Sequence, residues 1–188
     1  AGCSYIEITK NIKNLELIEH AVKTNIPVII STGDTNLEII SRALDVVKSI
    51  KSKKNSVALL HCTSEYPAQI RNINLKMIKF LSKKFMNIPI GFSDHSLGID
   101  FSVASVAMGA CIVEKHITIS RKMSGPDHFF AIEPMELNEM VSKVRNLEKS
   151  FGKFKKFRLP SENTIYICAF AKKGIKKKFN YIKKRYSF

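Results

Sequence analysis

Short apolar runs alternate with longer amphipathic segments along most of this chain. Four runs rich in Val, Ile and Leu are typical of strands buried on both faces, at residues 27–31, 57–61, 88–92 and 110–116. Apolar residues recur at helical spacing around them, which predicts helices over about residues 15–22, 35–50, 75–81, 101–107 and 134–151. A capping box of Thr35 and Glu38 begins the second helix, and Pro134 lies in the first turn of the last one.

The order of these segments predicts the class of fold. Strands that are apolar on both faces and alternate with helices form parallel sheets with right-handed crossovers. An open doubly wound sheet and part of a (β/α)8 barrel both fit this α/β pattern. The chain contains neither G-x-G-x-x-G nor G-x-x-x-x-G-K-[ST], which argues against a dinucleotide or P-loop site. A complete barrel takes about 250 residues, so a chain of 188 residues supplies at most part of one.

Composition supports a folded domain and excludes several classes of protein. Hydrophobic residues make up 45% of the chain, which rules out wholesale disorder, and no apolar run reaches the ~18 residues of a membrane span. The four cysteines have no C-x-x-C spacing, so neither a disulfide framework nor a structural zinc site is indicated. Cys62 and Cys111 lie in apolar runs and are predicted to be small core residues. We expect a cytoplasmic protein, and the missing initial Met suggests a piece of a longer one.

The positive charge is concentrated at the end of the chain. Residues 153–188 hold twelve Lys and Arg against one acid, Glu162, and so account for +11 of the formal net charge of +15. Aromatic residues are interleaved with these lysines, a composition that also suits binding to nucleic acid or to an anionic membrane surface. We favour a solvated tail, because the protein is rich in lysine throughout.

Polar residues follow each predicted strand, at residues 31–33, 61–66, 93–95 and 114–116. The carboxyl ends of parallel strands share one edge of the sheet, and ligands bind at this edge in α/β folds. Taken singly, each group is compatible with ordinary loop polarity. Four groups in register favour a binding site.

Two of these polar groups contain histidines that end consecutive strands, His95 and His116, and these should lie close together. Two neutral imidazoles with open coordination positions suit a divalent metal that acts as a Lewis acid. A structural role is the alternative for each histidine, and we assign that role to His61. The hydroxyls and backbone N–H groups of residues 31–33 can hold a phosphate. Asp127 follows a Gly-Pro bend and is either a turn aspartate or a partner for a sugar hydroxyl.

Together, these residues resemble the sialic acid synthase family, the phosphoenolpyruvate-dependent synthases of N-acetylneuraminate and related nonulosonates. The resemblance covers roughly residues 12–152. Five strings carry it in the same order along the chain: PVIISTG (27–33), ALLHCTSEYP (58–67), GFSDHSLGI (91–99), GACIVEKHIT (109–118) and GPDH (125–128).

The resemblance implies a fold and a reaction. The family's catalytic domain is a (β/α)8 barrel, and this chain would supply about strands five to eight with a degenerate strand four. The reaction condenses phosphoenolpyruvate with N-acetylmannosamine or a related acylamino sugar. Carbon 3 of the enol attacks the open-chain aldehyde, water adds to carbon 2, and phosphate leaves by C–O cleavage. A divalent ion, Mn²⁺ or Mg²⁺, polarises the aldehyde.

The resemblance also implies roles for single residues. His95 and His116 match the two metal-binding histidines of the family and are the expected catalytic pair. Three serines match positions that contact the phosphate of phosphoenolpyruvate or lie beside it, namely Ser31, Ser64 and Ser93. Tyr66 and Asp127 match positions that bind the amino sugar. Legionaminate and pseudaminate synthases share these motifs and are alternatives within the family.

The chain also departs from the family pattern. Strand four of the family carries a phosphate-binding lysine in a K-I-x-S pattern, whereas Ile6 and Thr9 occupy the ends of that pattern here. Residues 1–152 then correspond to the C-terminal half of the barrel, and residues 153–188 resemble a degenerate linker toward an antifreeze-like domain. Full-length members commonly form homodimers. We expect weak or no turnover by this chain alone, and a non-catalytic metal- or phosphosugar-binding remnant is the second hypothesis.

Overall fold

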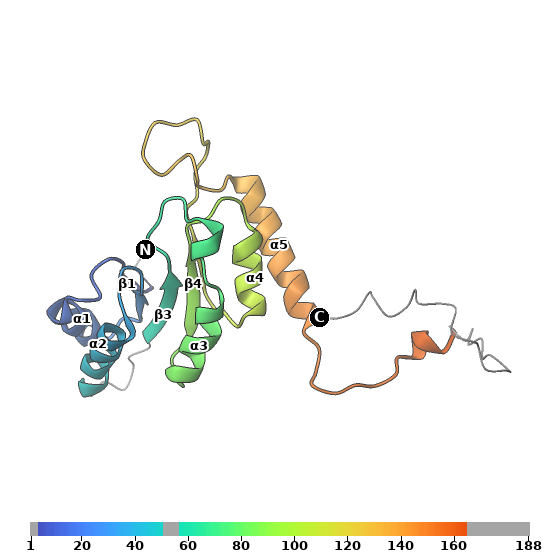
Figure 1. The fold of residues 1–188 in the computed structure, drawn as a ribbon, viewed down its shortest axis with the longest axis horizontal. Helices are drawn as coiled ribbons and strands as arrows, with labels where there is room; N and C mark the ends of the chain where they lie inside the picture. The colour runs from blue at the N-terminus through green and yellow to red at the C-terminus, as the bar shows by residue number, and fades with distance from the viewer. Residues whose placement is uncertain (1–3, 51–56, 165–188) are drawn as a thin grey trace, which may run out of the picture. The chain divides into compact units, whose positions relative to one another are not determined.

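The computed structural model describes residues 4–50 and 57–164 and divides the chain into two units, residues 1–151 and 152–188. In the first unit, strands alternate with helices (Figure 1): β1 (Ile6–Ile8), α1 (Leu15–Lys23), β2 (Val28–Ser31), α2 (Leu37–Ser49), β3 (Val57–Cys62), the 3₁₀ helix η1 (Ile70–Asn72), α3 (Lys76–Lys84), β4 (Ile90–Asp94), α4 (Asp100–Ala107), β5 (Val113–Lys115) and α5 (Pro134–Ser150). The described part of the second unit contains the 3₁₀ helix η2 (Pro160–Thr164).

The five strands are parallel, and each pairs with the next strand along the chain in the order β1-β2-β3-β4-β5. A doubly wound sheet reverses its strand order at a switch point, whereas a (β/α)8 barrel does not. The unbroken order therefore decides between the two predicted architectures. The sheet is a half-barrel, and helices connect its successive strands (Figure 1).

Strand alternation separates the face of the sheet that packs on the helices from the face that lines the barrel interior. Leu59 and Phe92 point toward the helices and are at most 2% exposed, packed with Ile18, Leu44 and Ile78. Each such side chain contributes roughly 1.5–3 kcal/mol when it is fully buried. The intervening residues point into the barrel interior, where space is short: a Cβ at Gly91 would lie 2.7 Å from the Ile112 carbonyl oxygen.

The predicted elements are present, with local corrections. The capping box at Thr35 is wrong, because the Asn36 side chain accepts a hydrogen bond from the Ile39 N–H and α2 begins one residue later. Asparagine is among the strongest N-caps, so it takes the position from threonine. The last strand spans only Val113–Lys115 instead of residues 110–116, and Cys111, which precedes it, is exposed and not a core residue. Pro134 does lie in the first turn of α5.

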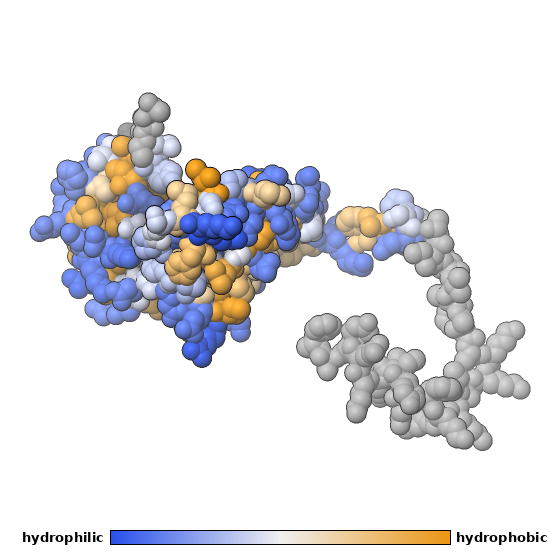
Figure 2. Space-filling model, turned by 90° about the horizontal axis from the view of Figure 1, so that it is seen from above, coloured by the Kyte–Doolittle hydropathy of each residue, from blue (hydrophilic) through white to orange (hydrophobic). Residues whose placement is uncertain are grey.

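On the face drawn in Figure 2, the described residues form no band of apolar side chains. Figure 2 shows apolar side chains in several separate places among polar ones. Within residues 4–50 and 57–164, no helix is both long and apolar enough to cross a bilayer. Most of the basic tail with its interleaved aromatic residues lies outside the described residues, so the hypothesis of nucleic-acid or membrane binding stays a prediction.

Candidate functional site

The structure brings all seven predicted site residues into one cavity of about 260 Å³. They come from the carboxyl ends of four strands and from the loop after β5: Ser31, Ser64, Tyr66, Ser93, His95, His116 and Asp127. Five further residues complete the wall: Thr9, Lys10, Gly33, Cys62 and Glu114. The shared edge of a parallel sheet thus gathers residues that are nearly 120 positions apart in sequence, from Thr9 to Asp127.

The two histidine rings meet edge to face at the carboxyl edge of the sheet, with 5.4 Å between ring centroids. His95 is 5% exposed, and its Nδ1 lies 2.8 Å from the carbonyl oxygen of Thr63. A carbonyl only accepts, so Nδ1 carries the hydrogen and Nε2 presents a lone pair to the cavity. Burial lowers the pKa of His95, against the opposing effect of the Thr63 carbonyl, and favours the neutral form that binds metals.

On the β2–β3 side, the cavity offers neutral hydrogen-bond donors. Ser31 is 5% exposed, and among the described residues its Oγ finds no hydrogen-bond partner. A buried unpaired hydroxyl is costly, so a polar ligand at this place would satisfy it. Gly33 lets Ser64 approach its main chain closely, since a Cβ there would lie 2.3 Å from Ser64 Oγ.

Two carboxylates, Glu7 of β1 and Glu114 of β5, interact across the barrel interior. Ser93 Oγ donates to Glu114 Oε1 at 2.5 Å. Burial, followed by a hydrogen bond with Glu114 and its charge, raises the pKa of Glu7 from 4.5 to about 7. Glu7, Cys62 and Glu114 come from the alternate strands β1, β3 and β5, as in one layer of side chains inside a barrel.

Aromatic and charged groups close the mouth of the cavity. The Tyr66 ring packs against His95 with 4.3 Å between centroids. The Lys10 ammonium lies 5.0 Å from the centre of the same ring, within cation–π range. Asp127 Oδ2 lies 3.7 Å from His116 Nδ1. Lys10 is the only Lys or Arg among the described residues that line this cavity.

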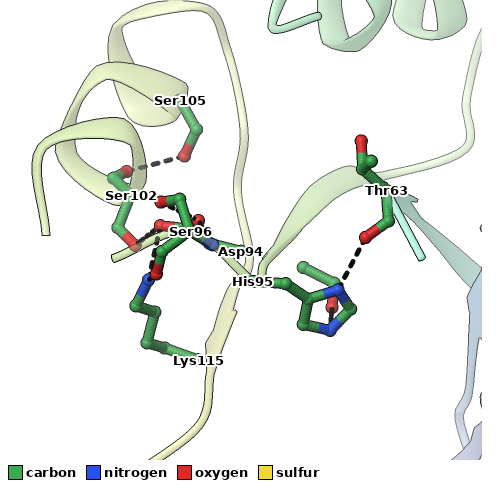
Figure 3. Close-up of polar contacts among 8 residues, drawn as sticks. Thr63, Asp94, His95, Ser96, Ser102, Ser105 and Lys115 are labelled. Carbon is green, nitrogen blue, oxygen red and sulfur yellow. Dashed lines mark hydrogen bonds and ion pairs between the residues drawn. The ribbon is translucent and has the colours of Figure 1, made fainter. Parts of the chain in front are cut away.

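Asp94 and Lys115 lie behind the histidines on the other face of the sheet. Figure 3 shows the side chains of Asp94 and His95 extending to opposite sides of the strand. Asp94 Oδ2 and Lys115 Nζ are 3.1 Å apart, and their side chains are 0% and 3% exposed. Burial lowers the pKa of Lys115, and the Asp94 carboxylate opposes this shift.

The residues missed by sequence reasoning could have been found from strand geometry. Lys10 comes directly after the short strand β1, at the same edge as the other site residues. Glu7 and Glu114 point into the barrel because consecutive residues of a strand point to opposite faces of the sheet. Cys62, predicted to be a core residue, is only partly buried and lines the cavity. The structural role predicted for His61 is confirmed, because this buried ring bonds the Ile73 carbonyl at 2.8 Å.

The raised pKa of Glu7 predicts a loss of stability with rising pH. The folded chain keeps a proton that the unfolded chain releases above pH 4.5, so stability falls as the pH rises from about 4.5 to about 7. Glu7 is partly exposed, and with solvent screening we expect a loss of about 1 kcal/mol. Chemical denaturation at pH 4, 6 and 8 should show a flatter profile for Glu7→Gln than for the wild type. The exposed Glu16→Gln control on α1 should keep the wild-type slope, and an unchanged slope in Glu7→Gln would refute the assignment.

Comparisons with known proteins agree with this geometry. The profile of the NeuB family matches residues 5–156. The chain is 41% identical over 170 residues to N,N'-diacetyllegionaminic acid synthase of Campylobacter jejuni, covering 88% of this chain and 51% of that protein. It is 38% identical over 149 residues to human N-acetylneuraminate-9-phosphate synthase, covering 79% of this chain and 41% of that protein. The chain spans about half the length of the curated relatives it matches.

A solved structure is similar as well. The crystal structure of N-acetylneuraminic acid (sialic acid) synthetase from Leptospira borgpetersenii, in complex with citrate, superposes with a TM-score of 0.78 at 36% sequence identity. The superposition covers 87% of this chain and 56% of that chain. Sequence and structure therefore point to the same set of synthases.

Proposed function

The chain belongs to the NeuB family, and we propose that it forms the half-barrel of a nonulosonate synthase that binds phosphoenolpyruvate, an acylamino sugar and a divalent metal ion. One observation carries the proposal: the seven residues that match the family's site line a single cavity. In the complete barrel these strands correspond to strands four to eight. The second hypothesis is a remnant that keeps metal or phosphosugar binding without turnover.

His95 and His116 are the proposed metal ligands. Two neutral imidazoles would leave coordination positions open for water or substrate. The family resemblance implies that the ion is Mn²⁺ or Mg²⁺. The two rings lie 5.4 Å apart between centroids and are the side chains proposed to bind the ion. The bound ion supplies positive charge at the aldehyde oxygen of the sugar. Thr63 fixes the tautomer of His95 and Tyr66 packs on its ring.

The phosphate of phosphoenolpyruvate is assigned to the β2–β3 side of the cavity. The unpaired Ser31 hydroxyl donates to a phosphate oxygen, and Ser64, packed against Gly33, offers a second hydroxyl in the same cavity. A positive charge is needed as well, because Glu114 and Asp127 line the same cavity and repel an anion. Lys10 supplies this charge at the mouth. It stands in for the lysine that the family carries within the preceding strand, where this chain has Ile6.

The acylamino sugar is assigned to the side of Tyr66 and Asp127, next to the metal. In the reaction, carbon 3 of phosphoenolpyruvate attacks the aldehyde, water adds to carbon 2, and phosphate leaves. Glu114 holds Ser93 through the 2.5 Å hydrogen bond and so keeps the floor of the cavity in place. N-acetylmannosamine is the sugar of the leading hypothesis. The precursors of legionaminate and pseudaminate are the alternatives.

Titration with phosphoenolpyruvate tests the proposal. Lys10→Met should weaken binding about tenfold, the loss of roughly 1.4 kcal/mol of charge-assisted interaction, and Ser31→Ala should also weaken it. Lys13→Met is the matched control, because Lys13 pairs with Asp34 outside this cavity and should bind as the wild type does. Isothermal titration at two salt concentrations measures the effect, which should shrink at high salt. Equal affinity in all four proteins would refute the assigned phosphate site.

A further inference from the structure

The buried pair of Asp94 and Lys115 lies one residue before the two proposed metal ligands. Strands β4 and β5 pair Phe92 with Val113, Ser93 with Glu114 and Asp94 with Lys115. His95 and His116 are the next residues on each strand. The ion pair is therefore the last link between the two strands before the histidines leave the sheet.

A network of hydrogen bonds holds this pair on all sides (Figure 3). Asp94 Oδ1 accepts from the N–H and the hydroxyl of Ser96 at 2.9 and 2.6 Å, and Oδ2 accepts from Ser102 Oγ at 2.5 Å. Lys115 Nζ donates to the Ser96 carbonyl at 2.5 Å. The pair thus joins β5, the turn after β4 and helix α4. Buried networks in which charged groups are paired and hydrogen-bonded are rigid.

These contacts, together with hydrogen bonds from the main chain, fix the backbone on both sides of each histidine. His95 lies between the two members Asp94 and Ser96, and its carbonyl accepts from the Ala68 N–H at 2.9 Å. His116 follows Lys115, and its carbonyl accepts from the Ile132 N–H at 2.9 Å. The charged side chains do not reach the cavity, because consecutive residues of a strand point to opposite faces. They act on the site only through the histidines.

We propose that Asp94 and Lys115 are positioning residues that hold His95 and His116 at the separation a shared metal ion requires. The inference rests on the proposed metal site for its function, and on the strand register and the buried network for its geometry. It assigns a role to a charged pair that makes no contact with the cavity. Removing the pair should therefore disturb the site even where the fold persists.

The test measures Mn²⁺ affinity in the full chain, metal-free at the start. Lys115→Met should weaken Mn²⁺ binding by about 10–100-fold, the range typical of partners that orient metal ligands. The double variant Asp94→Asn/Lys115→Met leaves no unpaired buried charge and should fold, yet it should also bind Mn²⁺ more weakly. Leu81→Ala removes a buried side chain of α3 that does not line the site cavity. This control loses stability but should keep the wild-type affinity.

A second readout separates this inference from the metal assignment. In the metal-free chain, NMR should detect contact between the His95 and His116 rings in the wild type and in Leu81→Ala, and weaker or no contact in both Lys115 variants. Retained contact and affinity in the double variant would overturn the positioning role. If the wild type binds no Mn²⁺, the proposed metal site is wrong. The NMR contact between the His95 and His116 rings then decides alone whether Asp94 and Lys115 position the histidines.

Discussion

Replacing His95 with alanine is expected to reduce the affinity of the chain for Mn²⁺ by about a hundredfold or more, equivalent to at least ~2.7 kcal/mol. The two histidine rings are the proposed protein ligands, with 5.4 Å between their centroids, so the loss of one ring removes half of the protein's donor atoms. His95 is already prepared for the role. The Thr63 carbonyl fixes its tautomer, and burial lowers its pKa, so little proton release opposes metal binding near neutral pH.

His116→Ala should produce a loss of the same size, because both ligands serve one ion. His20→Ala is the matched control: its imidazole is exposed on α1, away from the cavity, and its loss should leave the affinity unchanged. Titration followed by the Mn²⁺ electron paramagnetic resonance signal measures all four proteins directly. Wild-type affinity in both site variants would show that the histidine pair is not the metal site, and with it the aldehyde would lose its proposed electrophilic partner.

Most of the fold follows from periodicity alone, because the central strands are buried on both faces and the helices other than α4 carry regular apolar stripes. β1 was harder to locate, since its three residues include a glutamate and its assignment came from the family pattern. Helix ends depend on single hydrogen bonds, which explains why Asn36 and not Thr35 caps α2. Local patterns also cannot tell an apolar residue inside a strand from one just before it, as Cys111 shows.

The candidate site was predictable because strand ends in a parallel sheet share an edge. The polar pattern at the strand ends does not by itself show which face of the sheet each residue takes. Asp94 was grouped with Ser93 and His95 as rim polarity, yet it points to the helix side and meets Lys115. A strict period of two would have separated them. The distance across the interior from Glu7 to Glu114 is beyond any local pattern, since it depends on how far the sheet curves.

Lys115→Met is expected to lower the free energy of unfolding by about 3–5 kcal/mol, because it leaves the Asp94 carboxylate buried without its cation. Ser96 and Ser102 still donate to the carboxylate, but neutral hydroxyls do not replace a full charge. The double variant Asp94→Asn/Lys115→Met removes both charges and should recover more than about half of that loss, since neutral isosteres of buried ion pairs are often tolerated.

Urea denaturation at pH 7 measures the three proteins, with Lys143→Met as a control for the loss of an exposed ion pair. That control should change stability by less than about 1 kcal/mol. If the double variant were as unstable as Lys115→Met, the cost would lie in lost packing of the lysine stem and not in an orphaned charge. A positioning role predicts that the double variant regains part of its stability but still binds Mn²⁺ more weakly than the wild type. Stability then depends on whether a buried charge is left unpaired, whereas Mn²⁺ affinity depends on the link between the two strands.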